Sequence, residues 1–236
     1  MTRRPGGGNV SGVSDPRDNR PEDLPAGVFS AWLEQMRTAL RHEADADVAC
    51  GDCCACCSTA HFVHVGPDEE DALAHIPPEL LFPAPGLPPD HLVLGYDQRG
   101  RCPMLDEEGR CTIYGHRPLT CRTYDCRVFA AAGIDADREE ITRRARRWRF
   151  ACPAPRDRDE LAAVRAAARF VRDNAAAFPG GQVPDDPGQL AVLAVKVAGV
   201  FLGGGAAAEG GDSFAVAAAI VGASERGPER CAPPDE

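Results

Sequence analysis

Apolar residues near the N-terminus recur at the spacing of one face of an α-helix. An α-helix has about 3.6 residues per turn, so side chains three and four positions apart lie on the same side of the helix. In residues 28–46 the apolar positions with this spacing are Phe29, Trp32, Leu33, Met36 and Leu40. They predict an amphipathic helix over residues 28–46. The preceding residues 1–25 are rich in Gly, Pro, Asn and Asp, which predicts a disordered N-terminal tail.

Short apolar stretches bounded by turn residues follow in the middle of the chain. Pro67 and the acidic residues after it favour the start of a helix. Residues 76–90 contain six prolines, which predicts an irregular connection. The elements expected here are strands over 60–65, 92–96 and 111–114, a short helix over 68–75 and a helical turn over 116–124.

The last part of the chain alternates alanine-rich stretches with breaks of Pro and Gly. Helices are expected over residues 135–150, 157–178, 189–202 and 213–224. The longest apolar run, residues 190–202, is interrupted by Lys196 and is shorter than the roughly 20 residues that cross a membrane. We therefore expect no membrane span.

Composition and charge narrow the function classes. The chain has 236 residues, of which 44% are hydrophobic and 26% charged, typical of a soluble globular protein. The net charge of −10 argues against a general nucleic-acid binder, because phosphates attract cationic surfaces. No apolar export signal follows Arg3 and Arg4, so a cytoplasmic location is expected. The basic residues 138–149 predict either a solvated helix face or a contact site for an acidic partner.

The eleven cysteines do not fit this picture of an ordinary cytoplasmic protein. A reducing compartment disfavours a disulfide framework, and the number is odd. Nine of them fall within residues 50–126. Core packing accounts for one or two buried cysteines, whereas neighbouring Cys-Cys pairs in a polar turn are typical of metal binding.

The spacing of the cysteines is that of two half-sites. Residues 50–57 read Cys-Gly-Asp-Cys-Cys-Ala-Cys-Cys and contain overlapping C-x2-C pairs, each of which places two sulfurs on one ion. Because zinc takes four ligands, a second segment has to complete the site. The candidate metal ligands of the two segments are Cys50, Cys53, Cys56, Cys57, Cys102, Cys111, Cys121 and Cys126. Eight or nine thiols fit two four-ligand sites, or one site with spare thiols.

The pattern around these cysteines is similar to that of a known family. It comprises C-x2-C-x2-C-C, then C-P-x-L, then C-x-I-Y-x2-R-P-x2-C-R-x-Y, over about residues 48–130. This resembles the YkgJ-type cysteine-cluster family of zinc- or iron-chelating domains. The resemblance implies ligands at Cys50, Cys53, Cys56, Cys57, Cys102, Cys111 and Cys121. Two positions depart from the family pattern, Cys54 at a usual glycine and Cys126 near a usual proline.

The matching arginines Arg117 and Arg122 are expected to offset the negative charge of metal-bound thiolates. Cys54 and Cys152 stay open as further ligands, as do His61, His64 and His116.

The sequence thus predicts an α+β protein with a small cysteine-rich metal-centred domain over residues 26–152, made of short strands and irregular loops with an N-terminal helix. Residues 153–236 are expected to form a helical appendage. Thiolates select zinc or iron, and zinc is preferred, with iron or an iron–sulfur cluster as the alternative.

The role expected is structural or in metal handling. No catalytic constellation is evident, so an enzymatic role stays open. The alternatives are an iron–sulfur redox enzyme or accessory protein, linked to methylation by resemblance to flagellin lysine methylases, and a zinc-stabilised interaction module.

Overall fold

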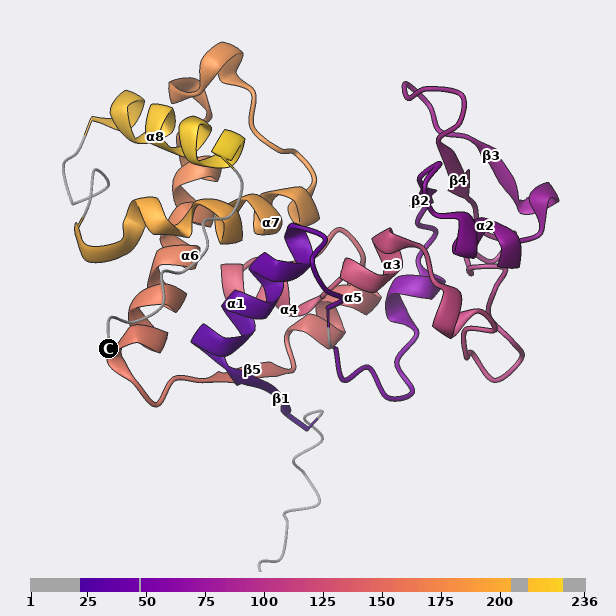
Figure 1. The fold of residues 1–236 in the computed structure, drawn as a ribbon. Coiled ribbons are helices and arrows are strands. Elements are labelled where there is room, and N and C mark those ends of the chain that lie inside the picture. The colour runs from indigo at the N-terminus through magenta and orange to yellow at the C-terminus, as the bar shows by residue number, and fades with distance from the viewer. Residues whose placement is uncertain (1–21, 47, 205–211, 227–236) are drawn as a thin grey trace, which may run out of the picture.

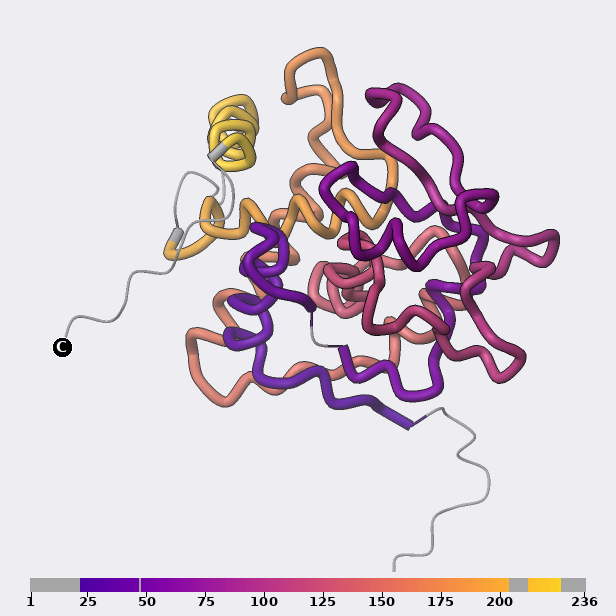
Figure 2. The backbone as a smooth tube through the Cα atoms, turned by 45° about the vertical axis from the view of Figure 1, so that its right-hand side comes forward, coloured from indigo at the N-terminus to yellow at the C-terminus, as the bar shows by residue number. Residues whose placement is uncertain are grey.

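The structure, a computed structural model, describes residues 22–46, 48–204 and 212–226. Figure 1 shows a helical part that contains α6, α7 and α8, and a smaller part built of short strands and loops that contains β2, β3 and β4. Figure 2 shows the same division from a second direction, with α8 at the far edge of the helical part. Of the tail predicted to be disordered, residues 1–21 lie outside the described residues.

The described elements are mostly short. The helices are α1 Phe29–Leu40, α2 Glu70–His75, α3 Leu119–Thr123, α4 Arg127–Ala132, α5 Glu139–Ala145, α6 Pro155–Asp173, α7 Pro187–Val197 and α8 Ser213–Arg226. The strands are β1 Leu24–Val28, β2 Val63–Val65, β3 Leu81–Pro83, β4 Leu92–Leu94 and β5 Trp148–Ala151. Short 3-10 segments are η1 Ala55–Ser58, η2 Pro78–Leu80, η3 Tyr114–His116, η4 Ala175–Ala177, η5 Pro179–Gly181 and η6 Ala198–Gly204. The mixture confirms the predicted α+β class.

The larger hydrophobic core joins α1 to α4, α5, α6, α7 and α8. Four of the five apolar positions that predicted the first helix, Phe29, Trp32, Leu33 and Met36, are buried in it. This helix ends at Leu40, before the predicted residue 46, because His42 adopts a positive φ of 60° that a helix cannot contain. The core contains residues from both sides of position 152, and the division of the chain there stays a prediction.

The predicted helix over residues 135–150 is wrong in its second half. Helix α5 ends at Ala145, and Trp148–Ala151 form strand β5, which pairs in parallel with β1. The reason is packing: the ring of Phe150 lies 5.0 Å from that of Phe29 and 4.8 Å from that of Trp32. The extended backbone of β5 places the ring of Phe150 against α1. Leu24 and Pro25 of β1 fall within the segment predicted as disordered.

The smaller part contains a three-stranded antiparallel sheet in the order β2-β4-β3. Strand β3 lies in the proline-rich segment predicted to be irregular. The strand predicted over residues 111–114 is absent from this described segment, where Cys111 forms only an isolated bridge with Leu105. A tight turn closes that bridge, with Gly109 at φ 80°, and η3 follows at once. A second core lies under the sheet and consists of Val65, Ala72, Ile76, Leu94, Met104 and Ile113.

The predicted helices of the last third are confirmed as α6, α7 and α8. Asp157 in the first turn of α6 accepts hydrogen bonds from the backbone N–H of Ala154, at 2.9 Å, and from the hydroxyl of Ser30, at 2.6 Å. It thereby connects α6 to the start of α1. Of the helices that the structure describes, none combines the length and the apolar character needed to cross a membrane.

Candidate metal centre

The first cysteine segment is a compact turn. The backbone N–H of Cys53 donates to the carbonyl of Cys50 at 3.0 Å, and that of Cys57 donates to the carbonyl of Cys54 at 2.9 Å. Gly51 has a φ of 54°, a left-handed conformation that glycine adopts without steric cost. The turn therefore gathers its thiols within a short length of backbone, as the C-x2-C spacing predicts.

The second cysteine segment folds back onto the first. The backbone N–H of Cys102 donates to the carbonyl of Cys57 at 2.7 Å, which joins the two segments directly. Cys111 lies across the narrow hairpin from Leu105. Cys121 is carried by α3, and Cys126 lies at the N-terminus of α4. Residues 50 and 126 thus come together although the chain between them forms a separate sheet.

A single cavity of about 1030 Å³ lies between the two segments. All eight predicted ligands line it, together with Cys54 and with His61. Each of these cysteines is a free thiol. Cys152 lies elsewhere, packed against the larger core, and His64 and His116 are not among the residues that line the cavity. The donor chemistry of the cavity, with many sulfurs at its wall, fits a thiophilic metal ion.

The sulfurs lie near one another but not at the spacing of a closed site. The Sγ atoms of Cys56 and Cys57 are 3.8 Å apart. Among the described residues, no three cysteine sulfurs lie within 4.8 Å of one another. Coordination of one ion by four of them therefore requires side-chain rotation and a small inward movement of the cavity wall.

Four thiols form a first group by their influence on one another's ionisation, and of these Cys126 packs against the larger core: Cys50, Cys53, Cys56 and Cys126. Burial first, and then the charges of Asp125, Cys50 and Cys53, raise the pKa of Cys126 to about 12, although the indole hydrogen bond from Trp148 lowers it. Burial and the charge of Cys53 raise the pKa of Cys50. Cys56 is raised in pKa by its hydrogen bond with Cys57 first, then by burial, and also by Cys50 and Cys126.

Four thiols form a second group by their influence on one another's ionisation, and of these Cys102 and Cys111 pack against the smaller core: Cys57, Cys102, Cys111 and Cys121. Burial, followed by the charges of Cys57, Cys102 and Cys111, raises the pKa of Cys121 to about 12. Burial and Cys57 likewise raise the pKa of Cys102 and of Cys111. The packing agrees with this grouping, because Cys126 lies against the larger core whereas Cys102 and Cys111 lie against the smaller one.

Cys57 links the second group to the first. The hydrogen bond from the Cys56 thiol is the main cause that lowers the pKa of Cys57, and the guanidinium of Arg117 lowers it further. Arg117 lines the cavity and lies over the ring of Tyr114 at 3.8 Å. The predicted role of Arg117 near the thiolates is thus consistent with its place. Arg122 instead pairs with Asp45 at 2.7 Å and is not among the lining residues.

Cys54 differs from the other eight cysteines of the cavity. Its sulfur accepts a hydrogen bond from the hydroxyl of Ser58 at 3.5 Å, and it faces Gly109, where a Cβ atom would lie 3.7 Å away. The contacts of Cys54 are thus with Ser58 and Gly109.

Side chains from the helical part hold the first group in place. The indole N–H of Trp148 donates to the sulfur of Cys126 at 3.3 Å. Arg144 lies over the ring of Trp148 at 5.0 Å and donates to the carbonyls of Ala49 and Cys50 at 3.1 and 3.0 Å. The sequence did not predict these contacts of Arg144 and Trp148. Arg144 stands in a run of arginines that is typical of a solvated helix face.

Asp125, the neighbour of Cys126, is fixed from two sides. Its carboxylate accepts from the indole N–H of Trp32 at 2.8 Å and pairs with Arg127 at 2.8 Å. Its side chain is almost completely buried. A buried carboxylate with both a neutral and a charged donor has little freedom to move. It therefore anchors the backbone that carries Cys126 to α1.

Comparison with known proteins identifies the cysteine segments. Residues 49–147 match the family model CxxCxxCC, described as a "putative zinc- or iron-chelating domain". Over these residues the chain is similar to the CxxCxxCC family. The CxxCxxCC match includes both cysteine segments and all eight predicted ligands, and it leaves α1 and α6–α8 outside. The zinc- or iron-chelating character predicted from the sequence is confirmed at this level. No curated protein and no solved structure matches the chain.

Proposed function

We propose that this protein binds zinc through two sites of four cysteine thiolates each, in a structural or metal-handling role. One site consists of Cys50, Cys53, Cys56 and Cys126, and the other of Cys57, Cys102, Cys111 and Cys121. The observation that carries the proposal is the common cavity, into which eight free thiols from two distant segments of chain are gathered. Cys54 is a ninth thiol that takes no part.

The division into two sites is supported by charge as well as by packing. Within each group the thiols influence one another's ionisation, and Cys57 also acts on Cys50 and Cys56 of the first group. Cys126 packs against the larger core, whereas Cys102 and Cys111 pack against the smaller one. Cys56 and Cys57 are adjacent in sequence but fall in different groups, with sulfurs 3.8 Å apart. The two ions would therefore be neighbours, joined by one peptide unit.

Zinc is favoured by the donor set and by the expected geometry. Thiolates select zinc over magnesium and calcium, and four-thiolate zinc is typically structural. A closed shell of four sulfurs leaves no position for a substrate, so the role proposed is stabilisation or metal handling and not Lewis-acid catalysis. Binding of a structural zinc ion contributes on the order of 10 kcal/mol to folding. The proposal includes a reducing, cytoplasmic location, where thiols stay available to metal.

An iron–sulfur centre is the second candidate, and the cavity favours it in one respect. A volume of about 1030 Å³ is more than two bare ions need and has room for inorganic sulfide. Hydrogen bonds to cluster sulfurs adjust reduction potential, and the indole of Trp148 offers such a donor at Cys126. In this case the protein would carry out electron transfer, as an enzyme or as an accessory to one.

Metal and sulfide analysis of protein purified without air distinguishes the two candidates. We expect about two zinc ions per chain and no acid-labile sulfide. The variants Cys121→Ser and Cys126→Ser should each lose one ion, from different sites. The variant Cys54→Ser is the matched control, because it removes a thiol of the same cavity. It should keep both ions, since Cys54 is a ligand in neither proposed site. A brown protein with equimolar iron and sulfide would contradict the zinc proposal and support an iron–sulfur centre. A protein without stoichiometric metal would contradict both proposals.

A further inference from the structure

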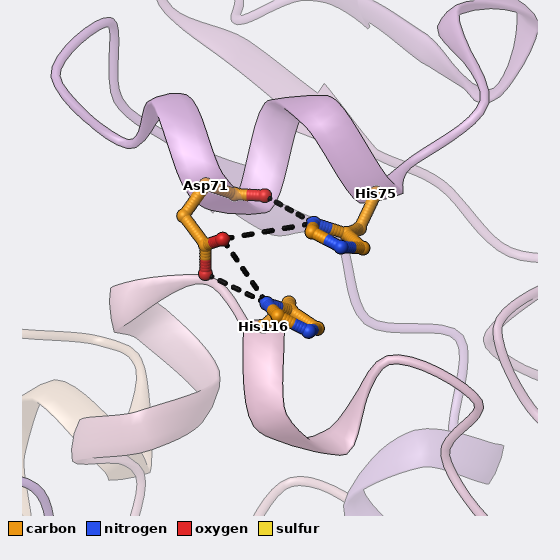
Figure 3. A group of neighbouring side chains, drawn as sticks. All are labelled: Asp71, His75 and His116. Carbon is orange, nitrogen blue, oxygen red and sulfur yellow. Dashed lines mark hydrogen bonds and ion pairs between the residues drawn. The ribbon is translucent and has the colours of Figure 1, made fainter.

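Three side chains with metal-ligating atoms meet outside the cysteine cavity. Asp71 and His75 belong to α2, and His116 belongs to η3 (Figure 3). One ligand atom from each lies within 4.8 Å of the others. The Nδ1 atom of His116 is 2.9 Å from a carboxylate oxygen of Asp71, and that of His75 is 3.7 Å from the carboxylate. The CxxCxxCC description concerns chelation in the cysteine-rich domain and gives these residues no role.

Local structure brings the three residues together. Asp71 and His75 are four apart on a helix, so their side chains lie on the same face. The ring of His116 stacks on that of His75, with centroids 3.6 Å apart and planes within 6° of parallel. Asp71 and His116 are 45 positions apart in the sequence, so the contact depends on the fold of the second cysteine segment against α2.

The donor set is that of a divalent transition-metal site. Two imidazoles and one carboxylate bind zinc, iron(II) and similar borderline ions, with water in the remaining positions. We propose that Asp71, His75 and His116 form a second, surface metal site for a divalent ion such as Zn²⁺, distinct from the thiolate centre. The inference goes beyond the proposed function and does not depend on it.

Binding of an ion requires a modest rearrangement. Because the two rings are stacked, an ion in the plane of one imidazole lies off the plane of the other. One ring must turn about its side-chain bonds, and the carboxylate must release its hydrogen bond to His116. The Nδ1 atom of His75 must also release the backbone carbonyl of Asp71, to which it donates at 2.7 Å. All three side chains are free to do so, since His75, His116 and Asp71 are 41%, 44% and 70% exposed. The exposure also predicts a readily exchanged ion, in contrast to the ions of the cysteine cavity.

The two kinds of site would be mechanically connected. His116 lies between Cys111 and Cys121 in the second cysteine segment, whereas Asp71 and His75 lie in the sheet-bearing part. An ion shared by them would fasten α2 to the segment that contributes three of the second group's four thiols. The ligand softness differs, so the surface site favours borderline divalent ions and the cavity favours thiophilic ones.

Cobalt(II) binding tests the inference on full-length protein with its tightly held metal left in place. After removal of loosely bound ions, we expect one additional Co²⁺ per chain, with the weak d–d absorption of nitrogen and oxygen ligands and no thiolate-to-cobalt charge transfer. We expect each of three substitutions to weaken cobalt binding by about tenfold or more: His75→Ala, His116→Ala and Asp71→Asn. Cysteine-bound metal, measured in the same samples, should stay unchanged.

His91→Ala is the matched control. His91 also stacks on a second histidine, His64, at 5.1 Å, but no third ligand completes a group there among the described residues. This variant should bind the additional cobalt as the unaltered protein does. Wild-type protein that takes up no additional Co²⁺, takes it up with thiolate charge transfer, or binds it equally well after the three substitutions overturns the proposal. In the first case Asp71 and His116 are an ion pair between α2 and η3 and nothing more. Circular dichroism confirms that each variant is folded.

Discussion

The indole nitrogen of Trp148 lies 3.3 Å from the sulfur of Cys126 and donates its hydrogen to it. Trp148 is the first residue of β5, the strand that pairs with β1 beside the larger core. The hydrogen bond therefore joins the helical part of the protein to the cysteine cavity. It also stabilises negative charge on a thiolate, which is the form that binds metal.

Replacement of Trp148 by Phe should weaken retention of the metal held by the first group. The ring volume is largely kept, but the donor to Cys126 is lost, and loss of such a ligand partner typically costs about tenfold in affinity. Competition with a chromophoric chelator measures the change. Arg149→Ala, one residue along and exposed, is the control and should hold metal as tightly as the unaltered protein. Equal affinity of Trp148→Phe would show that the indole does not support the site.

Asp125→Asn should destabilise the protein strongly. The carboxylate is buried and pairs with Arg127 and the indole of Trp32, and removal of one charge from a buried pair costs about 3–5 kcal/mol. Denaturant unfolding measures the loss. Asp135→Asn is the matched control, because Asp135 also pairs with an arginine, Arg146, but both side chains are exposed. That change should cost less than about 1 kcal/mol. Similar losses for the two variants would contradict the anchoring role of Asp125.

The stability of the metal-free protein should fall in alkaline solution. Burial, the first cause in each case, raises the pKa of Cys121 and of Cys126 from 9.0 to about 12. The folded chain therefore holds these protons more tightly than the unfolded chain does. Their contribution is fully present below pH 9 and is lost as the pH rises towards 12. Melting temperatures of metal-free protein between these limits should decline, and the Cys126→Ser variant should decline less. A flat profile would contradict the burial of these thiols.

Removal of metal under reducing conditions should loosen the cysteine segments and spare the helices. The amide of Cys102, bonded to Cys57, and that of Thr112, bonded to Met104, should lose protection against hydrogen exchange. Amides of α6 should keep theirs, since the buried face of that helix packs in the larger core. Unchanged protection at Cys102 and Thr112 in verified metal-free protein would contradict a folding role for the metal.

The sequence predicted those features that local spacing determines. The periodic residues Phe29, Trp32 and Met36 indicated α1, and the C-x2-C pairs indicated the first half-site. The pairing of β1 with β5 was missed, because two short parallel strands more than a hundred residues apart leave no local pattern. The strand predicted at Cys111 was wrong for a related reason, since a turn of five residues closes the hairpin after a single bridge.

Within the candidate site, the sequence named the eight cysteines but could not group them. Cys54 and Cys56 have equivalent neighbours in the sequence, and only the fold shows that Cys54 faces Gly109 and Ser58. The contacts of Arg144 and Trp148 with the first cysteine segment and with Cys126 depend on how α5 and β5 pack there. No sequence motif predicts this packing. The same holds for Asp71 and His116, which come together only through the packing of α2 on η3.

Cadmium-113 NMR can assign the thiol ligands of each ion residue by residue. With ¹¹³Cd in place of zinc, scalar coupling to cysteine β-protons shows which residues bind each ion. We predict two thiolate-bound resonances, one coupled to Cys50, Cys53, Cys56 and Cys126, and the other to Cys57, Cys102, Cys111 and Cys121. A resonance coupled only to cysteines of residues 50–57, or one coupled to Cys54, would contradict the account.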